Sequence, residues 1–322
     1  MRRRALLVGA LAAVAPAIAV AQAERTARIG LLGIGSEESR DLRAPVVAGL
    51  RELGYQEGRN LTLVDRTQVD RYENLAAAAK ELAQLNLDVV ICWGSAAPRA
   101  AMAAMPGTPI VLVGGDPVAS GLVKSYARPG GNVTGVATMS IDLIGKLLEL
   151  LKDALPGLRL VSALLNPTSP TELRSMEQAG RDAQRLGLEL RRAEVHAAVD
   201  FEPAIAAAAR EKSQALLLIP STMLYVNRRR IASAAIQHGL PCAGAFIEFA
   251  EAGALLGYGA DRQKLMREAA RFADRILKGE APATMAIERA TQLELAINLK
   301  TAAALAVKIP DVVRFRASRV IE

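Results

Sequence analysis

Two short loops combine free backbone amides with polar side chains, which is the chemistry needed to bind a small charged molecule. Gly94-Ser95-Ala96-Ala97 follows an apolar run and opens a helical pattern, so its amides and the Ser95 hydroxyl are suited to a carboxylate. Gly114-Gly115-Asp116-Pro117 follows the next apolar run, where the Asp116 carboxylate is suited to an ammonium group. Serine and aspartate at such positions are equally typical of helix and turn caps. The sequence therefore leaves a ligand contact and a cap open as interpretations at both loops.

Further candidate contacts fall at equivalent loop positions elsewhere in the chain. Taken singly, each is more often a cap or a turn residue than a ligand contact; they are Ser36, Asn166, Ser221, Thr222, Glu248 and Tyr258. Trp93, the only tryptophan, ends the apolar run before Gly94. Its indole is suited both to stacking on a ligand and to filling the core.

Patterns that support catalysis or metal binding are absent from the sequence. The two histidines, His196 and His238, have no motif neighbours, and there is no GxSxG, HExxH, CxxC or paired-acid pattern. We therefore predict no catalytic residue, no metal and no cofactor. A secreted enzyme that used the same loops would need a perturbed acid–base pair, for which Asp116 and Glu248 are the candidates.

The first 23 residues have the three parts of a secretory signal peptide. MRRR is cationic, ALLVGALAAVAPAIAVA is apolar, and Ala21-Gln22-Ala23 fits a small-x-small cleavage site. A membrane anchor is the alternative, but the apolar run is short and contains Pro16. Arg3-Arg4 also loosely fits a twin-arginine signal, which leaves the export route open. We predict an exported, periplasmic protein that is cleaved near Ala23.

Charge and cysteine content narrow the classes of partner. Removing residues 1–23 removes three arginines and lowers the formal net charge from +7 to +4. The remaining charge is spread thinly and only 3% of the residues are aromatic, so we predict no nucleic-acid partner. Cys92 and Cys242 lie in apolar runs of different halves of the chain, which favours buried free thiols over a disulfide.

Continuous apolar runs alternate with helical patterns along most of the 322 residues. In the first half, strands are predicted over 27–33, 60–66, 88–93 and 108–114, with helical spacing between them. The rhythm restarts in the second half, with strands predicted over 159–166, 188–195, 214–220 and 240–246. Apolar strands separated by helices are typical of parallel sheets covered on both faces. The predicted fold class is α/β, with two doubly wound parallel-sheet lobes joined by a multi-stranded hinge.

Two glycine-rich segments are interpreted as crossings between the lobes. ARPGGNVTGV (127–136) precedes a strand-like segment and no Lys-Ser or Lys-Thr follows it, which argues against a phosphate-binding loop. EAGALLGYGAD (251–261) is the second such segment, and the predicted hinge residues are Gly130, Gly131, Asn132, Gly257 and Gly259. The predicted N-terminal lobe holds 24–138 and about 259–284, and the C-terminal lobe about 139–258 and 285–322. A cleft between such lobes is where a small ligand is expected to bind.

Four segments resemble the ABC transporter substrate-binding protein family of the tryptophan/tyrosine-binding type. They are LRELGYQEGRNL (50–61), GDPVASGLVKSYARPGGNVTGV (115–136), EFAEAGALLGYGAD (248–261) and LAINLKTAAALAVKIP (295–310). The resemblance runs from about residue 27 to the last residue. It implies the type I periplasmic-binding fold, in which two α/β lobes joined by a three-segment hinge close around one ligand.

The resemblance also implies a function and a set of contacts. The implied protein is a monomeric solute receptor that delivers an apolar or aromatic amino acid, or a related carboxylate, to an ABC permease. Carried onto this sequence, the loop with Ser95, Ala96 and Ala97 contacts the carboxylate and Asp116 lies near the amine. The contacts implied from the second lobe are Asn166, Ser221 and Thr222. Trp93 departs from the small or β-branched residue usual in the family, which implies a reshaped pocket.

The sequence leaves two other functions open. A ligand-sensing partner of a membrane signalling protein would use the same fold and the same cleft, so the sequence does not separate sensing from transport. The secreted α/β enzyme considered above is the second alternative.

Overall fold

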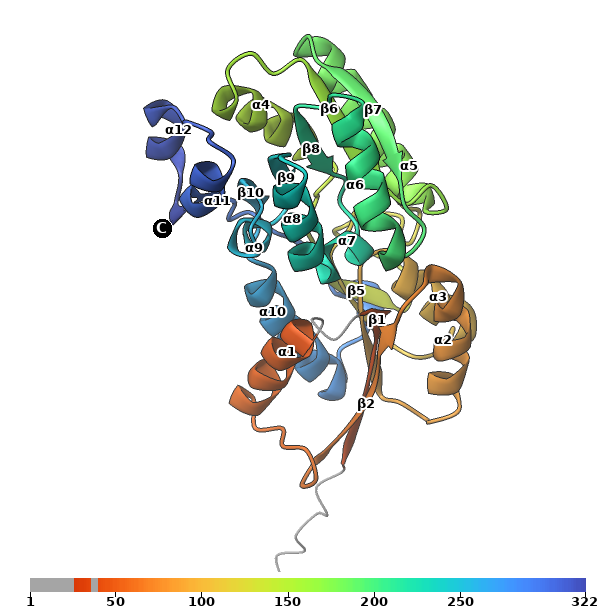
Figure 1. Ribbon diagram of the computed structural model, residues 1–322. Coiled ribbons are helices and arrows are strands. Elements are labelled where there is room, and N and C mark those ends of the chain that lie inside the picture. The colour runs from red at the N-terminus through yellow and green to blue at the C-terminus, as the bar shows by residue number, and fades with distance from the viewer. Residues whose placement is uncertain (1–25, 36–39) are drawn as a thin grey trace, which may run out of the picture.

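The computed structural model describes residues 26–35 and 40–322, which form two α/β lobes (Figure 1). The predicted signal peptide and Ser36 lie outside these residues. The sheet of the N-terminal lobe has the order β11-β5-β4-β3-β1-β2, and all of its pairs are parallel. Its strands are β1 (Ala27–Ile34), β2 (Leu61–Val69), β3 (Val89–Trp93), β4 (Ile110–Val113), β5 (Val133–Ala137) and β11 (Glu288–Arg289).

Helices cover both faces of this sheet, as its apolar strands require. On one side α1 (Arg40–Glu52) packs against α10 (Arg262–Leu277), and on the other α2 (Leu75–Ala83) packs against α3 (Ala96–Ala104) (Figure 1). Every residue of β3, β4 and β5 is buried between these layers, because a parallel sheet with helices on both faces leaves no side exposed to water.

The C-terminal lobe repeats this architecture with a longer sheet. Its order is β13-β12-β10-β9-β8-β6-β7, parallel except for the antiparallel pair of β10 and β12. The strands are β6 (Leu160–Leu165), β7 (Glu189–Glu194), β8 (Ala215–Leu218), β9 (Cys242–Gly244), β10 (Leu256–Gly259), β12 (Glu294–Asn298) and β13 (Arg319–Ile321). The helices are α4 (Ile144–Ala154), α5 (Pro170–Arg185), α6 (Phe201–Arg210), α7 (Thr222–Val226), α8 (Arg228–Gln237), α9 (Ile247–Glu251), α11 (Leu299–Ala304) and α12 (Asp311–Arg316). The predicted α/β fold of two doubly wound lobes is confirmed.

The chain passes between the two sheets three times. It leaves the first sheet after β5, returns to it after β10, and leaves it again after β11, which pairs with β5. The predicted boundary between 284 and 285 is therefore too early, because β11 belongs to the N-terminal lobe. Three separate connections of this kind permit hinge closure while restraining the lobes from sliding.

The predicted hinge at Gly130, Gly131 and Asn132 is wrong. These residues lie before β5, whereas the crossing follows that strand. The Gly130 amide donates to the Ala283 carbonyl, and the Asn132 side chain donates to the carbonyls of Met105 and Thr108, all within the N-terminal lobe. These hydrogen bonds hold the start of β5 in place, at the opposite end of the strand from the crossing.

The second glycine-rich segment contains a strand that the sequence analysis missed. Gly257 and Gly259 belong to β10, the last strand before the second crossing. A β-carbon at Gly257 would lie 2.4 Å from the Phe246 carbonyl oxygen, and one at Gly259 would lie 2.6 Å from that of Ala245. Glycine is needed here because two backbones approach too closely for any side chain.

Both cysteines are free and buried, Cys92 in β3 and Cys242 in β9. Burial raises the pKa of the Cys242 thiol to about 12 and that of Cys92 well above its usual range. Such thiols remain protonated and unreactive at neutral pH. The prediction of free thiols is confirmed.

No helix in the described part of the chain has the length and apolarity needed to cross a membrane. Within residues 26–35 and 40–322, there is also no group of three or more His, Cys, Asp or Glu side chains placed to hold a metal ion.

Candidate functional site

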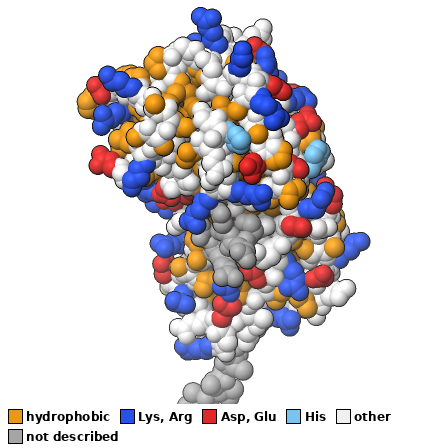
Figure 2. Space-filling model, viewed as in Figure 1, with side chains coloured by type: hydrophobic (Ala, Val, Ile, Leu, Met, Phe, Trp, Pro, Cys, Tyr) orange, Lys and Arg blue, Asp and Glu red, His pale blue; other side chains and the backbone are white. Residues whose placement is uncertain are grey.

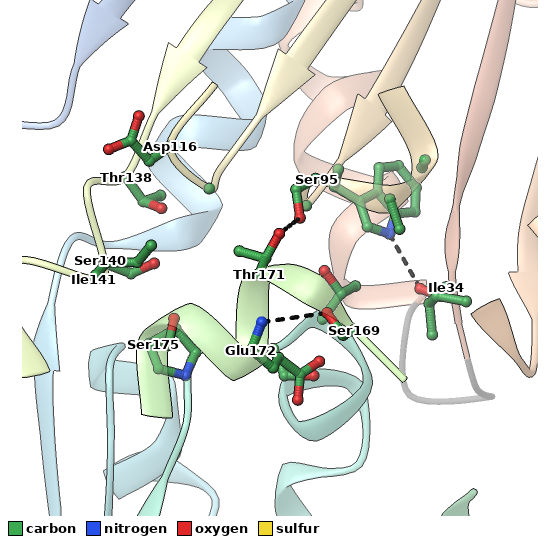
Figure 3. A pocket seen from close by; sticks show the side chains of 18 of the residues that line it. Ile34, Ser95, Asp116, Thr138, Ser140, Ile141, Ser169, Thr171, Glu172 and Ser175 are labelled. Carbon is green, nitrogen blue, oxygen red and sulfur yellow. Dashed lines mark hydrogen bonds between the residues drawn. The ribbon is translucent and has the colours of Figure 1, made fainter. Parts of the chain in front are cut away.

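A cavity lies between the lobes where the ends of several strands and helices meet (Figure 3). Its volume is about 40 Å³, on a scale where one water needs roughly 10–15 Å³. The N-terminal lobe contributes the ends of β1 and β3 and the start of α3, and the C-terminal lobe contributes the first turns of α5 and α7. The carboxyl ends of parallel strands face this space, which is where open α/β sheets bind their ligands.

Side chains of the two lobes meet directly at the cavity. The Ser95 Oγ lies 3.0 Å from the Thr171 Oγ1 (Figure 3). The Tyr72 hydroxyl donates to the Glu172 Oε1 at 3.1 Å and lies 3.2 Å from the Ser221 Oγ. Each of these contacts joins the N-terminal lobe to the C-terminal lobe. The structure therefore has its lobes closed.

Gly94 allows the two lobes to approach each other closely at Thr222 as well. Its φ is +75°, and a β-carbon there would lie 2.3 Å from the Thr222 Oγ1 of the opposite lobe. A side chain at this position would strain the backbone and would also require the Thr222 side chain to move. The glycine before Ser95 thus has a role at the lobe interface.

Seven of the predicted contacts are brought together by the fold. They line the cavity and are Trp93, Ser95, Ala96, Ala97, Asp116, Ser221 and Thr222. Ser95 is the residue before α3, but its side chain forms no cap hydrogen bond there, so its hydroxyl faces the cavity and the opposite lobe. Ser221 both caps α7, by accepting from the Leu224 amide, and approaches Tyr72.

Asp116 has the cap role that the sequence left open. Its Oδ1 accepts hydrogen bonds from the backbone amides of Val118 and Ala119, and from the Tyr126 hydroxyl. In Figure 3 its carboxylate lies at the edge of the cavity and points away from Ser95. A variant that removes this carboxylate would disturb the loop as well as any contact with a ligand.

The remaining three predicted contacts do not line the cavity. Asn166 and Glu248 are buried directly behind residues that line the cavity. The backbone amide of Asn166 donates to the Glu172 Oε2, and the Glu248 Oε1 accepts from the backbone amide of Arg262. Tyr258 is half-buried and packs against the core of the C-terminal lobe instead.

Trp93 forms an apolar wall of the cavity and is fully packed into the N-terminal lobe. It is 1% exposed, and its indole N–H donates to the Ile34 carbonyl at 3.1 Å. A β-carbon at Gly33 would lie 2.1 Å from the Trp93 Nε1. Trp93 therefore fills the space that a side chain at position 33 would need. Its indole N–H already has a hydrogen-bond acceptor in the protein, so it is not available to a ligand.

Residues that the sequence analysis missed supply much of the polar lining. Besides Tyr72, Glu172 and Arg262, they are the hydroxyl residues Thr138, Ser140, Ser169, Thr171 and Ser175. In Figure 3, Thr138 and Ser140 face Ser95 and Thr171 across the cavity. A weak signal was present, because Ser169-x-x-Glu172 has the spacing of a helix-capping pair, and Ser169 does accept from the Glu172 amide.

The cavity wall contains most of the buried polar atoms that lack a partner. Among the described residues, six buried side-chain nitrogen or oxygen atoms form no hydrogen bond, and four of them belong to Thr138, Ser175 and Arg262 of the lining. Buried polar groups are nearly always paired in folded proteins because an unpaired one costs roughly 1–3 kcal/mol. Their concentration at one cavity indicates a place where a polar molecule binds.

Glu172 is a buried carboxyl group in this wall. Burial raises its pKa to about 7, although it accepts from the Asn166 amide and the Tyr72 hydroxyl. Burial and the charge of Glu172 together raise the pKa of Tyr72 well above its usual range. The tyrosine therefore stays a neutral donor, and Glu172 changes charge near neutral pH.

A larger groove of about 710 Å³ lies beside the cavity. Residues common to both linings separate the two spaces and are Tyr72, Ser95, Ala96, Ser169 and Thr171. The contacts that join the lobes at Ser95 and Tyr72 thus also divide the inner cavity from the groove. Arg99 and Arg174 lie along the groove, where they donate to the carbonyls of Ser120 and Ala119.

Comparisons with known proteins agree with this arrangement. Residues 29–321 match the sequence model of the family described as ABC transporter substrate binding protein. A tyrosine-binding protein of Clostridioides difficile strain R20291 is 25% identical over 262 residues, which cover 80% of this chain and 74% of the relative.

Two solved structures show the same fold over nearly the whole chain. A conserved domain protein from Vibrio cholerae O1 biovar eltor strain N16961 has a TM-score of 0.85 and 28% identity, covering 92% of this chain and 100% of that one. An ABC domain from Streptococcus pneumonia in complex with L-Trp has a TM-score of 0.82 and 22% identity, with coverage of 92% and 100%.

Proposed function

Because the chain belongs to the ABC transporter substrate binding protein family, we propose that it is the solute receptor of an ABC importer. In this role it closes its two lobes around a small molecule and carries that molecule to a membrane permease. The observation that carries the proposal is the group of unpartnered buried atoms on Thr138, Ser175 and Arg262. Thr138 and Arg262 come from the N-terminal lobe and Ser175 from α5 of the C-terminal lobe, so one bound molecule would satisfy all of them only when the lobes are closed.

The proposed solute is an amino acid or a related small carboxylate. The lining offers eight serine and threonine hydroxyls, the buried cation of Arg262 and two carboxyl groups, Asp116 and Glu172. This set can bind a carboxylate and an ammonium group at the same time. The tyrosine-binding relative supports the same class. With about 40 Å³ of closed cavity, compact solutes are favoured over bulky ones unless the side chain enters the adjoining groove.

Binding without turnover is part of the proposal. The family is one of solute-binding proteins, and closure on a ligand stabilises the protein by linkage rather than by chemistry. We further propose a periplasmic location after export directed by residues 1–23, and action as a monomer that docks on the permease.

The test is a thermal-shift screen of the purified protein after unfolding and refolding to remove any bound solute. Amino acids, carboxylates, purines and sugars would be compared at millimolar concentration. A solute at about a hundred times its Kd adds roughly 2.7 kcal/mol to the free energy of unfolding, which raises Tm by a few degrees. A response confined to amino acids or carboxylates supports the proposal. A response confined to purines or sugars would show that the solute belongs to another class.

The contribution of Asp116 needs a variant that preserves its cap. Asp116→Asn keeps an oxygen that can accept from the Val118 and Ala119 amides but removes the charge. If Asp116 holds the ammonium group of an amino acid, the variant keeps its Tm without solute and loses the shift. A full shift with the variant removes Asp116 from the proposed contacts.

A further inference from the structure

Arg262 is the first residue of α10 and stands where the chain returns to the N-terminal lobe. Its side chain lines the cavity and the residue is only 3% exposed. Its Nε and Nη2 form no hydrogen bond with any described residue. An arginine remains charged at all physiological pH values, so this is a buried positive charge with two unused donors.

The surroundings of Arg262 hold the guanidinium group without neutralising it. Its central carbon lies 4.5 Å from the centre of the Tyr225 ring and 5.1 Å from that of Phe246. These two rings pack edge to face at 5.5 Å and form a rigid aromatic support. Cation–π contacts of this kind attract the charge but offer no lone pair to accept its N–H groups.

The neighbouring carboxyl group, Glu248, does not complete an ion pair. Its Oε1 accepts from the backbone amide of Arg262 at 2.8 Å, and its Oε2 is buried without a partner. Burial raises the pKa of Glu248 to about 7, so it carries only part of a negative charge at neutral pH. Of the other charged groups near α10, Asp261 caps the helix through the Lys264 amide, and Arg228 adds positive charge over the same Tyr225 ring at 4.6 Å.

An uncompensated buried cation costs several kcal/mol, and the fold contains this one at the wall of its ligand cavity. A carboxylate is the partner that best fits a guanidinium with two free donors, because the two groups form paired hydrogen bonds in one plane. Resting on the proposed function, we infer that Arg262 binds the carboxylate of the solute and makes a negatively charged group a requirement for binding. This differs from the sequence-based expectation, which placed the carboxylate at Ser95 and the start of α3.

The experiment compares matched probes on wild-type protein and variants by thermal shift and isothermal titration. The probe pairs are L-tyrosine with tyramine, L-leucine with isopentylamine, and L-alanine with ethylamine, which differ only in the carboxylate. Inorganic phosphate and sulfate are the anion controls. We expect wild-type protein to respond to at least one amino acid, and to neither its amine partner nor the inorganic anions.

Three arginine variants then separate binding from folding. Arg262→Gln should weaken binding of the responding amino acid by roughly 30-fold or more, because a charged hydrogen bond is lost, and Arg262→Lys should weaken it by roughly tenfold since it keeps the charge but not the fork. The Tm of Arg262→Gln without solute should equal or exceed that of wild type, because removing an unpaired buried charge removes its cost. Arg228→Gln is the matched control: it removes a buried arginine over the same ring that does not line the cavity, so affinity should stay within about twofold.

The outcomes distinguish the inference from the proposed function. If the wild type responds to an amino acid and Arg262→Gln keeps the same affinity, the inference is overturned and the receptor proposal stands. The carboxylate assignment is also overturned if the wild type responds equally to an amino acid and its amine, or if it responds to phosphate or sulfate. The receptor proposal stands in both cases. If no carboxylate shifts the wild type, both the solute class and the inference fail.

Discussion

At the scale of single residues, the polar groups of the candidate site form two layers, one that lines the cavity and one that is buried behind it. The sequence pointed to Asn166 and Glu248, and the structure places them behind Glu172 and Arg262. The sequence pattern predicted residues that contact the lining residues directly, because helix caps and strand ends depend on neighbouring residues in the chain. It could not reveal the two lining residues, because an arginine or glutamate in the first turn of a helix is normally exposed, and its burial depends on the opposite lobe.

The carboxyl groups of Glu172 and Glu248 give the protein a specific dependence on pH. Burial raises both pKa values to about 7, whereas a glutamate in an unfolded chain has a pKa of about 4.3. The folded protein therefore keeps protons that the unfolded chain releases. The resulting stability is fully present below about pH 4.3 and is lost as the pH rises through about 7, on the order of 3 kcal/mol for each group.

We expect Tm to fall between pH 4.5 and pH 7.5 as these two groups ionise. Glu172→Gln imitates the protonated side chain and should reduce that slope by roughly half, and the double variant with Glu248→Gln should remove most of it. Scanning calorimetry over this pH range measures the effect. A full slope in the double variant would show that other groups cause the dependence.

Gly33 offers a second test at this scale. The structure explains this glycine by the indole of Trp93, whose Nε1 lies 2.1 Å from where a β-carbon would be. Gly33→Ala should destabilise the protein by about 1–3 kcal/mol through overpacking. In a Trp93→Leu background the same change should cost less than about 0.5 kcal/mol. Denaturant unfolding of the four proteins gives the coupling, and additive effects would exclude this explanation.

At the scale of elements, the apolar strands of both lobes were predictable because a strand buried on both faces is a continuous apolar run. The exceptions have identifiable causes. The helical stretch between the predicted strands 214–220 and 240–246 is divided into α7 and α8 at Asn227, whose side chain donates to the Met223 carbonyl. The sequence analysis missed strand β10 because Gly257 and Gly259 interrupt its apolar pattern. These glycines are needed because another stretch of backbone lies against them, and such a contact leaves no signal in the neighbouring sequence.

The two groups of predicted hinge glycines should now respond differently to substitution. Gly257→Ala should cost about 1–3 kcal/mol, since its β-carbon would meet the Phe246 carbonyl oxygen and the Ile247 backbone. Gly131→Ala should be nearly neutral, within about 0.5 kcal/mol, because no atom lies within 4 Å of a β-carbon there. Chemical denaturation measures both. Equal costs at the two positions would contradict the explanation of Gly257 by close backbone contact.

At the scale of the whole molecule, the surface carries mixed charge while the candidate site lies between the lobes. Figure 2 shows blue and red side chains interspersed over the visible face of both lobes. The number of crossings could be anticipated only through the resemblance to a family, and β11, a strand of two residues, is too short for any periodic signal. The contacts that close the cavity join residues about 75 to 150 positions apart, so they arise from the assembled fold and not from a local motif.

We expect one solute to bind between the lobes and to hold them closed, and hydrogen–deuterium exchange can detect this in both lobes at once. The protein would be compared with and without the solute that stabilises it most in the thermal-shift screen. We predict added protection in segments of both lobes, namely 94–98, 138–144, 169–175, 220–224 and 260–264, with no change in α12 far from the cavity. Protection confined to one lobe, or found only along the outer groove at 99–103, would contradict it.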